Sequence, residues 1–553
     1  MQKKNTKYIF VVGGVISGVG KGITASSIGL ILKNRGFDVT SVKIDPYVNV
    51  DAGTMNPTEH GEVFVLSDGD ETDQDMGNYE RFLNLNLTRI NYMTTGRVYK
   101  TVIEKERNLE YGGRCVEVVP HIPLEVMNRI KTAGENAKAD IVIIEIGGTI
   151  GEYQNILFLE AARMMKIENP KDVIFVMVSY LPTPGKVGEM KTKPTQYAVR
   201  TLNSSGISPD MLVARADTVL DEKRKEKLSM FCNISSDRII SAPDVDSIYD
   251  IPLNFEKEKL SEKLCEILSL SKRNPDEKAW SAWKNFAKHS HNGKQVVNIA
   301  MVGKYFESGD YMLSDSYLSV IEALKYSAYA QNRKPIISWL SSVDFEQHPE
   351  KLKELKKYDG IIVPGGFGKR GVEGNLSAIK FARENKIPYF GLCYGMQMMV
   401  IEYARNILGL KDANTREVNP NSKNMVIDVM ESQKEILKNN LYGGSMRLGA
   451  YKAVLREGTI AKNSYGKKEI IERHRHRYEV NPSFIGDLEA KGLVFSGRSP
   501  GGHLMEIAEL PKSKHPFFLG TQFHPEFLAH PLTPHPLFSA FIKACIGKQK
   551  KQK

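Results

Sequence analysis

Short, almost entirely apolar runs recur along the N-terminal half of the chain and alternate with longer stretches of helical periodicity. These runs occupy residues 8–12, 39–44, 141–146 and 173–178. Strands that are buried on both faces of a parallel sheet have this composition, because none of their positions faces water. The pattern therefore predicts an α/β domain built on a parallel sheet.

A polar, charged stretch at residues 271–294 carries two of the three tryptophans and separates this half from a second series of strand-like runs. The second series lies at residues 296–302, 336–339, 360–363 and 387–392. We predict two α/β domains, each a doubly wound, mainly parallel sheet with its active site at the carboxyl ends of the strands. The expected boundaries are 1–270 for the first domain, 271–294 for a partly helical linker, 295–545 for the second domain and 546–553 for a lysine-rich, solvated tail.

Composition and charge narrow the class of protein. The chain has 553 residues, of which 41% are hydrophobic and 25% charged, as in ordinary folded globular proteins. The formal net charge is 76 − 65 = +11, which is modest for this length. Zinc-finger spacing, a helix-turn-helix pattern and basic stretches interleaved with aromatic residues are all missing. We therefore expect the positive charge to serve phosphorylated small molecules rather than nucleic acid.

The N-terminus and the cysteines bear on location. The apolar run that follows the basic N-terminus spans only residues 8–12, and no stretch of about 18 apolar residues occurs. The five cysteines are scattered and never form a Cys-x-x-Cys pair, so neither a disulfide framework nor a zinc site is indicated. These features predict a cytoplasmic protein without a membrane segment.

A glycine-rich turn at residues 13–24 follows the first apolar run and leads into a helical pattern. Backbone N–H groups and a helix N-terminus at such a turn bind phosphate oxygens, and Lys21 is placed to reach the β- and γ-phosphates. The spacing departs from the standard G-x-x-x-x-G-K-[ST], because residue 15 is Val and Gly22 follows Lys21. We predict a deviant phosphate loop, with a simple turn as the alternative.

A nucleoside triphosphate brings Mg²⁺, which requires carboxylates near the phosphates. Glu145 lies at the end of the apolar run 141–146, and the acidic residues 68–75 offer further ligands unless they form a solvated loop. Two lysines, two hydroxyls and an amide lie within residues 191–196. This second segment suits another phosphorylated ligand, although an exposed basic loop is an equal alternative.

Cys393 lies in Gly-Leu-Cys-Tyr-Gly, between an apolar run and a helical pattern. This is the thiol counterpart of a nucleophile elbow, in which a tight turn exposes the side chain at a helix N-terminus. His524 would accept the thiol proton and Glu526 would hold the imidazole. Backbone N–H groups of residues 364–368 would stabilise an oxyanion. The combination predicts a Cys-His-Glu triad.

Taken together, these motifs resemble the CTP synthase family over nearly the whole chain. The resemblance rests on Gly-Gly-Val-x-Ser-x-x-Gly-Lys-Gly, Gly-Leu-Cys-x-Gly-Met-Gln and Phe-His-Pro-Glu, together with Lys-Thr-Lys-Pro-Thr-Gln at residues 191–196. Residues 43–47, 60–63, 145–149, 244–249 and 473–478 also read as the family reads. The family joins a phosphate-loop synthetase domain to a class I glutamine amidotransferase domain. The resemblance implies that ATP phosphorylates O4 of UTP and that ammonia from glutamine then displaces phosphate, which completes de novo CTP synthesis.

The resemblance also implies roles for individual residues. Those expected at ATP are Ser17, Gly18, Val19, Gly20, Lys21, Gly22, Asp75, Pro243, Asp244 and Val245, with Asp75 and Glu145 at Mg²⁺. Those expected at UTP or the product CTP are Ser17, Glu152, Tyr153, Gln154, Lys191, Thr192, Lys193, Pro194, Thr195, Gln196 and Lys227. Those expected at L-glutamine, beside the triad of Cys393, His524 and Glu526, are Gly366, Tyr394, Gly395, Met396, Gln397, Glu417 and Arg477.

Regulation and assembly are implied only by the resemblance. It implies GTP as an allosteric activator, CTP as a feedback inhibitor, an internal ammonia channel, a homotetramer and filaments. Two departures from the family pattern occur. Residues 152–154 read Glu-Tyr-Gln where Asp-x-Glu is frequent, and Pro243 stands where a lysine is common. The first removes an acidic contact to the product, and neither touches the chemistry.

Two other functions fit part of the sequence. One is a different phosphate-loop amidotransferase, such as a cobyrinic-acid-type amidase, which would lack the lysine-rich segment 191–196. The other is a nucleotide-binding scaffold without turnover, which would have no use for a complete triad.

Overall fold

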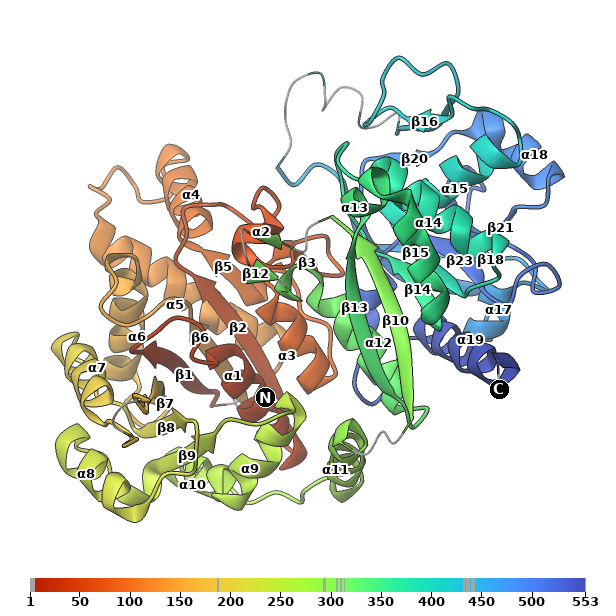
Figure 1. Ribbon diagram of the computed structural model, residues 1–553. Helices are drawn as coiled ribbons and strands as arrows, with labels where there is room; N and C mark the ends of the chain where they lie inside the picture. Colours follow the sequence, from red (N-terminus) through yellow and green to blue (C-terminus); the bar gives the residue numbers. More distant parts are fainter. Residues whose placement is uncertain are drawn as a thin grey trace. The chain divides into compact units, whose positions relative to one another are not determined.

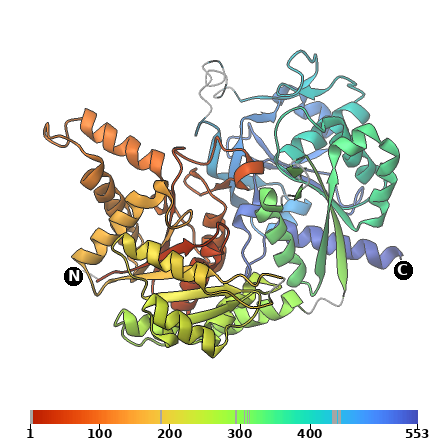
Figure 2. The same ribbon diagram turned by 60° about the vertical axis from the view of Figure 1, so that its left-hand side comes forward.

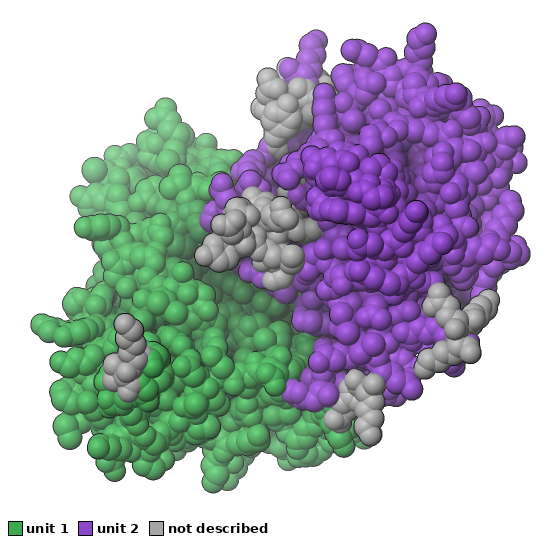
Figure 3. Space-filling model, in the orientation of Figure 1, with its two compact units in different colours: residues 1–51, 75–288 green, residues 52–74, 289–553 purple. Residues whose placement is uncertain are grey.

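The computed structural model describes residues 5–185, 188–291, 295–304, 307–308, 311–312, 314–430, 433, 438 and 443–552. The chain forms two compact units, coloured separately in Figure 3. Unit 1 comprises residues 1–51 and 75–288, and unit 2 comprises residues 52–74 and 289–553. The excursion of residues 52–74 into unit 2 differs from the two contiguous domains expected from the sequence.

Unit 1 is built on a seven-stranded sheet in which every neighbouring pair of strands is parallel. The connections from β1 and from β7 run toward opposite edges of this sheet, so the loops after these two adjacent strands flank a crevice at their carboxyl ends. The strand order is β5 (Tyr92–Thr94), β2 (Val39–Asp45), β6 (Ile141–Ile146), β1 (Lys7–Gly14), β7 (Val173–Tyr180), β8 (Met211–Ala216) and β9 (Ile239–Pro243).

Helices cover both faces of this sheet, as Figure 1 shows. Alternate residues of β6 point to opposite faces. Val142 and Ile144 pack into the core beneath α5 and α6, whereas Ile143 approaches Gly29 of α1 on the other face. All six residues of β6 are buried, as the apolar run predicted. The helices are α1 (Lys21–Asn34), α3 (Asp75–Leu83), α4 (Thr95–Arg107), α5 (Val118–Asn136), α6 (Ile156–Glu168), α7 (Lys193–Ser204), α8 (Glu222–Cys232), α9 (Ile251–Lys257) and α10 (Leu260–Ile267).

The stretch expected as a linker is largely a helix, α11 (Glu277–His291). Trp283 is 1% exposed, donates its indole N–H to Tyr249 O at 3.0 Å and packs against Phe82 and Phe286. Most of this stretch therefore belongs to unit 1, and Trp283, Phe286 and Ala287 attach it to the core while its other side chains are mostly exposed. Residues 292–294 lie outside the described residues.

Unit 2 contains a nine-stranded sheet that is mixed, not mainly parallel. Strands β13, β10, β14, β15 and β23 pair in parallel, and β22, β21, β18 and β19 extend the sheet by antiparallel pairing. The antiparallel part escaped the sequence prediction because charged residues interrupt its strands, unlike the apolar runs of the parallel part. In spatial order the strands are β13 (Lys334–Ser341), β10 (Val296–Gly303), β14 (Gly360–Val363), β15 (Tyr389–Leu392), β23 (Phe518–Thr521), β22 (Met505–Glu509), β21 (Val494–Arg498), β18 (Arg447–Leu455) and β19 (Glu469–His476).

Three small sheets also occur among the described residues of unit 2. They are β3 (Phe64–Val65) with β4 (Glu71–Thr72), β11 (Glu307–Ser308) with β12 (Tyr311–Met312), and β16 (Asn414–Thr415) with β17 (Met425–Val429) and β20 (Tyr478–Val480). The helices are α2 (Pro57–His60), α12 (Leu318–Tyr329), α13 (Ser342–Gln347), α14 (Val372–Glu384), α15 (Tyr394–Asn406), α17 (Ile460–Tyr465), α18 (Pro482–Ala490) and α19 (Pro536–Gln552).

The C-terminal stretch expected as a solvated tail continues helix α19, which packs against α12 and β14 (Figure 2). Lys548 donates to the backbone carbonyls of Tyr358 and Lys356, and Gln549 donates to Asp359 at 2.7 Å. The first part of this lysine-rich segment is therefore anchored on unit 2, and only residue 553 lies outside the described residues. Among the described residues, no helix is both long and apolar enough to cross a membrane.

Residues 52–74 pack into unit 2 although they connect β2 to α3 of unit 1. Arg473 of β19 donates to Val65 O and to Ser67 Oγ, each at 3.1 Å. Arg475 of the same strand forms an ion pair with Glu71 at 2.8 Å. Glu62 accepts hydrogen bonds from the backbone N–H and the hydroxyl of Ser319 near the start of α12. Charged side chains elsewhere in unit 2 thus bind residues 52–74, which lie in the sequence between two stretches of unit 1.

Candidate active sites

The predicted phosphate loop follows β1 at the crevice of unit 1. Gly18 and Gly20 have φ of +69° and +88°, values that favour glycine, and α1 begins at Lys21. Ser17 and Gly18 are exposed, whereas Lys21 is 7% exposed and donates to Gly148 O at 2.8 Å. Burial lowers the pKa of Lys21 against the opposing effect of Glu145. The loop thus presents an open backbone cradle with a lysine at its base.

The departure from the standard motif at Gly22 has a steric reason. A Cβ on residue 22 would lie 2.6 Å from Cγ of Asp75, which is closer than real Cβ contacts. Serine or threonine at this position would therefore displace the carboxylate of Asp75. A glycine here lets α1 and the first residue of α3 approach each other.

A buried lysine gathers the carboxylates expected at Mg²⁺. Lys43 Nζ lies 2.6 Å from Asp75 and 2.8 Å from Glu145, with Asp45 at 3.7 Å. Burial opposes the charge on Lys43, but these carboxylates outweigh it and hold its pKa well above the usual value. Burial raises the pKa of Asp45 to about 6, and Tyr79 donates to Glu145.

Lys43 was within a stretch that resembled the family, but its part in the site was missed. The signal was a lysine inside a run that was predicted to be buried on both faces of the sheet, where an unpaired charge would not be tolerated. Two carboxylates held together beside a phosphate loop fit Mg²⁺, which takes one or two carboxylates and completes its shell with phosphate oxygens and water.

The second predicted segment follows β7, the strand beside β1, and starts α7 at Lys193. Thr195 is buried and bonds Ser179 Oγ at 2.9 Å, and Gln196 donates to Thr192 at 3.1 Å. Lys191 forms an ion pair with Glu189 at 2.6 Å. Pro194 occupies the first turn of α7. The exposed Lys227 of α8 acts on the same glutamate, since Lys191, Arg224 and Lys227 together lower its pKa.

The expected product-binding residues lie after β6. Glu152 accepts hydrogen bonds from the backbone and hydroxyl of Thr149 and, at 2.6 Å, from Gln154. Burial opposes ionisation of Glu152, but these hydrogen bonds outweigh it and lower its pKa. Tyr153 is 94% exposed. Glu152 is thus preorganised as an anion, and Tyr153 is open to a ligand.

The expected adenine segment begins at Pro243, the last residue of β9, and continues through Asp244 and Val245. Arg215 of β8 forms an ion pair with Asp244 and donates to Val19 O of the phosphate loop at 3.3 Å. Sequence reasoning missed Arg215, whose only signal was a charge near the end of an apolar strand. It links the two segments expected to bind ATP.

In unit 2, Cys393 occupies a strained elbow between β15 and α15. Its φ and ψ are 48° and −97°, a conformation that non-glycine residues rarely adopt. A Cβ on Gly391 would lie 2.7 Å from the backbone carbon of Gly395, so the tight turn requires glycine there. The strain is located at the predicted nucleophile.

The predicted triad residues come together around a pocket of about 80 Å³. His524 Nδ1 lies 2.7 Å from Glu526 Oε1. Burial disfavours the imidazolium, but the charges of Glu526 and Cys393 outweigh it and raise the pKa of His524 to about 10. The pocket is lined by Pro57, Glu62, Val63, Ser316, Tyr317, Gly365, Gly366, Phe367, Cys393, Arg475, His524, Glu526 and Phe527.

Of the other residues expected at glutamine, Gly366 lines this pocket, whereas the lining does not include Tyr394, Gly395, Met396, Gln397, Glu417 or Arg477. Glu417 accepts a hydrogen bond from Gly368 N at 2.7 Å, and burial raises its pKa. Tyr394 donates to Gly368 O at 3.1 Å. Arg477 donates to Gln433 and Ser445 at 2.9 and 3.0 Å. The side chain of Met396 is buried, so only its backbone is available to a ligand.

Two further groups near the nucleophile were not expected from the sequence. Lys304 donates to Gly368 O at 2.7 Å and lies over the Tyr394 ring, and burial lowers its pKa to about 8. Gln522 is fully buried and donates to Cys393 Sγ at 3.6 Å. Cys393 in turn contacts Arg475 O at 3.7 Å.

The fold and these sites define a class of protein: a phosphate-loop synthetase joined to a triad glutamine amidotransferase. Two family models match the chain, "CTP synthase N-terminus" over residues 7–270 and "Glutamine amidotransferase class-I" over residues 312–544. The chain belongs to the CTP synthase family, glutamine-hydrolysing ligases that aminate UTP to CTP.

Similarity to individual proteins extends over the full chain. It is 49% identical to the CTP synthase of Methanocaldococcus jannaschii, over 99% of this chain and 100% of that protein. It is 48% identical to the CTP synthase of Sulfolobus acidocaldarius, over 97% and 99%. A solved structure, the glutaminase domain of Trypanosoma brucei CTPS with bound acivicin, is 36% identical, covers 46% of this chain and 94% of that one, and has a TM-score of 0.42. The alternatives of a cobyrinic-acid-type amidase and a scaffold are therefore set aside.

Proposed function

We propose that unit 2 hydrolyses L-glutamine at Cys393 and that unit 1 uses the ammonia to aminate UTP after ATP has phosphorylated its O4 atom. O4 attacks the γ-phosphorus and ADP leaves. Ammonia then attacks C4 and phosphate leaves. The intermediate is needed because a carbonyl oxygen is a poor leaving group and its phosphate ester is a good one. The observation that carries the synthetase half is the convergence of Asp75 and Glu145 on Lys43 beside the phosphate loop.

The loop from Ser17 to Gly22 would bind the ATP phosphates, with Lys21 at the β- and γ-phosphates. Asp75 and Glu145 would hold Mg²⁺, which supplies neutralisation of phosphate charge when it is bound. The segment from Pro243 to Val245 would contact the adenine. Arg215, which bonds both this segment and the loop, would align them.

The pyrimidine nucleotide would bind at Ser17, the segment 191–196 and Lys227. The position of that segment beside the phosphate loop, on the neighbouring strand, supports this placement. The product CTP would contact Glu152, Tyr153 and Gln154. The carboxylate of Glu152 would accept a hydrogen bond from the 4-amino group of cytosine, because the hydrogen bonds that it already accepts lower its pKa and keep it ionised.

In unit 2 the Cys393 thiolate would attack the side-chain amide of glutamine. His524 holds the proton that the departing ammonia takes, and it then receives a proton from the water that hydrolyses the thioester. Glu526 keeps His524 in the orientation and charge state for this transfer. The backbone of Gly366 and of residues 394–397, with Glu417 and Arg477, would bind the amino acid. Glu417 suits its ammonium group and Arg477 its carboxylate.

Regulation, assembly and location extend the proposal. GTP would activate glutamine hydrolysis, CTP would inhibit, and the chain would form cytoplasmic homotetramers and filaments. Ammonia would leave the pocket past Pro57, Glu62 and Val63, which belong to residues 52–74 of unit 2. Family membership supports these statements. Glutaminase rates with and without GTP test the activation, and light scattering with and without UTP and ATP tests the assembly.

Oxygen labelling tests the phosphorylated intermediate. UTP carrying ¹⁸O at position 4 is incubated with ATP, Mg²⁺ and ammonium, and the inorganic phosphate is analysed by mass spectrometry. The proposal predicts one ¹⁸O atom in the phosphate for each CTP formed. Label that appears in water instead would show that ammonia displaces O4 without phosphorylation.

A further inference from the structure

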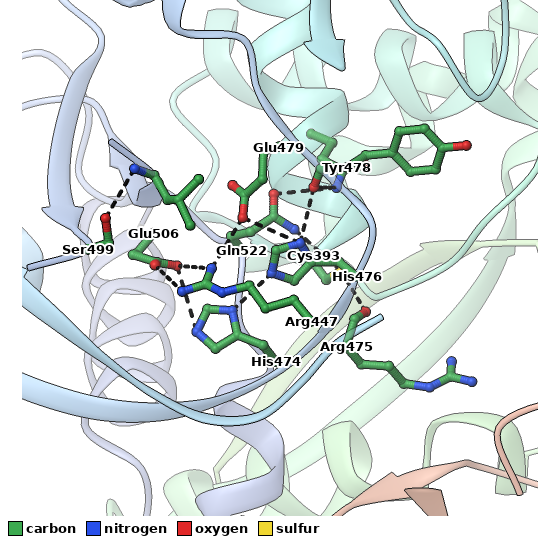
Figure 4. Close-up of polar contacts among 12 residues, drawn as sticks. Cys393, Arg447, His474, Arg475, His476, Tyr478, Glu479, Ser499, Glu506 and Gln522 are labelled. Carbon is green, nitrogen blue, oxygen red and sulfur yellow. Dashed lines mark hydrogen bonds and ion pairs between the residues drawn. The ribbon is translucent and has the colours of Figure 1, made fainter. Parts of the chain in front are cut away.

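A group of buried charged and titratable side chains lies behind the nucleophile in unit 2 and has no part in the mechanism above. We call it the buried histidine cluster, and Figure 4 shows its members converging beside Cys393. The side chains come from four strands of unit 2, and none is more than 9% exposed. The members are Arg447, His474, His476, Glu479 and Glu506.

The two histidines belong to a strand whose alternation separates two tasks. His474 and His476 point to one face of β19, while Arg473 and Arg475 point to the other and reach residues 65–71. The backbone carbonyl of Arg475, between the two histidines, contacts Cys393 Sγ at 3.7 Å. The cluster therefore anchors one side of the strand end that touches the nucleophile.

Hydrogen bonds determine the protonation of His476. Its Nδ1 lies 3.1 Å from Tyr478 O, which only accepts, so Nδ1 carries a proton. Its Nε2 lies 3.0 Å from Nδ1 of His474. A neutral His476 accepts at Nε2, so His474 donates from Nδ1. These tautomers are assigned from the hydrogen-bond partners.

The same chain of hydrogen bonds leaves Nε2 of His474 unprotonated. This nitrogen lies 3.7 Å from Glu506 Oε2 and has no hydrogen bond. A bare imidazole nitrogen repels a carboxylate oxygen. Charge balance leads to the same point, because Arg447 faces both Glu479 and Glu506, at 3.2 and 2.8 Å. One guanidinium cannot neutralise two buried carboxylates. The cluster therefore holds one additional proton.

The pKa directions agree with this count. Burial and the charge of Glu506 raise the pKa of Glu479, and burial raises that of Glu506. Burial and Arg447 lower the pKa of His476, and burial, His476 and Arg447 lower that of His474. The other groups that face the histidines are Tyr451 on β18 and His524 after β23.

A continuous path of hydrogen bonds joins the cluster to the thiol. Tyr478 O accepts from His476 and also from Gln397 Nε2, at 3.2 Å. Gln397 donates to Gln522 Oε1 at 3.3 Å, and Gln522 donates to Cys393 Sγ at 3.6 Å. Both amides are buried, so each has one orientation that satisfies its partners.

We propose that the buried histidine cluster positions Cys393 for glutamine hydrolysis through the amides of Gln397 and Gln522. Its members are positioning residues, because none of them touches the substrate or the sulfur. The proposal rests on the role of Cys393 as nucleophile. Errors of about 1 Å at a reacting atom cost up to about 100-fold in rate, so the cluster acts on kcat rather than on KM.

Two substitutions of His476 separate positioning from packing. The amide nitrogen of His476→Asn replaces Nδ1 and keeps the hydrogen bond to Tyr478 O. The amide of His476→Gln replaces Nε2, so it keeps the contact with His474 and loses the one with Tyr478. Both variants are polar, uncharged and close in size to histidine. His535 is the matched control, because it is also buried and lies 3.1 Å from the buried Glu472. Its other hydrogen bonds join it to Tyr465 and to the start of α19 rather than to Cys393.

Glutamine hydrolysis and ammonia-dependent CTP formation are measured on the full chain, with thermal unfolding alongside. We expect His476→Gln to lower the glutaminase kcat by about 10-fold or more with KM within about 3-fold, and His476→Asn to retain at least about a third of the wild-type kcat. We expect His535→Gln to lower the unfolding temperature and leave kcat unchanged. Ammonia-dependent synthesis should persist in all three variants, which shows that unit 1 is folded, and the thermal unfolding transition shows whether unit 2 is folded.

Equal glutaminase kcat values for His476→Asn and His476→Gln would overturn the proposal, and so would a loss in His535→Gln as large as that in His476→Gln. If His476→Gln does not fold, Glu506→Gln takes its place, because its amide donates to His474 and mimics the protonated acid. The proposal predicts that Glu506→Gln keeps the wild-type kcat and that Glu506→Leu loses it, and equal values would overturn it. Glutamine hydrolysis by Cys393→Ala would instead refute the nucleophile itself, which distinguishes the two failures.

Discussion

Placing the serine of the standard phosphate-loop motif after Lys21 should strongly slow the synthetase. The variant Gly22→Ser produces G-K-S, which most phosphate loops carry. A Cβ at residue 22 would lie 2.6 Å from Asp75 Cγ, and ordinary contact begins at 3.4 Å. The carboxylate must therefore move by at least 3.4 − 2.6 = 0.8 Å, away from its 2.6 Å contact with Lys43. Errors of about 1 Å in positioning cost up to about 100-fold in rate, so we expect a loss of about 30- to 100-fold.

The assay is CTP formation from UTP, ATP and ammonium, which bypasses the glutaminase. Gly22→Ala should behave like Gly22→Ser, because the clash comes from Cβ and not from the hydroxyl. Gly29→Ala on the same helix is the control. Its Cβ would meet Leu83 Cδ2 at 2.6 Å, the end of a flexible side chain in the core, so it should cost stability and leave kcat within about 2-fold. Wild-type turnover in Gly22→Ala would refute the steric reading of the motif.

Three further outcomes follow from the sites. Glu526→Gln should remove the stabilisation that Glu526 gives to the protonated His524. This stabilisation is fully present below pH 6.5, where the histidine of the unfolded chain is protonated, and it is lost as the pH rises through the folded pKa of about 10. The unfolding temperatures of wild type and variant should therefore converge as the pH rises, and a constant difference would contradict the pairing. Arg215→Ala should raise the KM for ATP by about 10-fold, since one charge-assisted contact is worth about 1.5 kcal/mol, and should leave glutaminase activity intact; an unchanged KM would remove Arg215 from the ATP site. Lys304→Met should raise the KM for glutamine more than it lowers kcat, because Lys304 braces Gly368 and Tyr394, and equal ammonia-dependent rates are the control.

Patterns in the sequence predicted the parallel half of the architecture well, because strands buried on both faces are apolar throughout. The prediction of α/β folds is confirmed, and the elbow at Cys393 has the expected strand, turn and helix. Strands β18 and β19 were missed because they contain charged residues such as Arg447 and Arg475, whose ion-pair partners are distant in the sequence and come close only in the folded chain. Without knowledge of those partners, the charged residues suggest that the strands are exposed on the surface.

The sites were predicted in proportion to how local their signals are. Cys393, Lys21 and Glu145 lie at or soon after strand ends within short motifs, so the sequence alone singled them out as candidates. Lys43, Arg215 and Gln522 act through partners more than 25 residues away, and no spacing rule reports such contacts. Residues 52–74 illustrate the same limit, because their apolar positions are buried by a unit that begins more than 200 residues later.

The division of labour between the two units is tested most directly by measuring CTP formation from UTP, ATP and Mg²⁺ with glutamine or with ammonium, for wild type and for Cys393→Ala. We predict that wild type uses both nitrogen sources and that the variant uses only ammonium, at the wild-type rate. A variant that still makes CTP from glutamine would contradict the assignment of the nucleophile, and a wild-type enzyme that makes CTP from neither source would contradict the account as a whole.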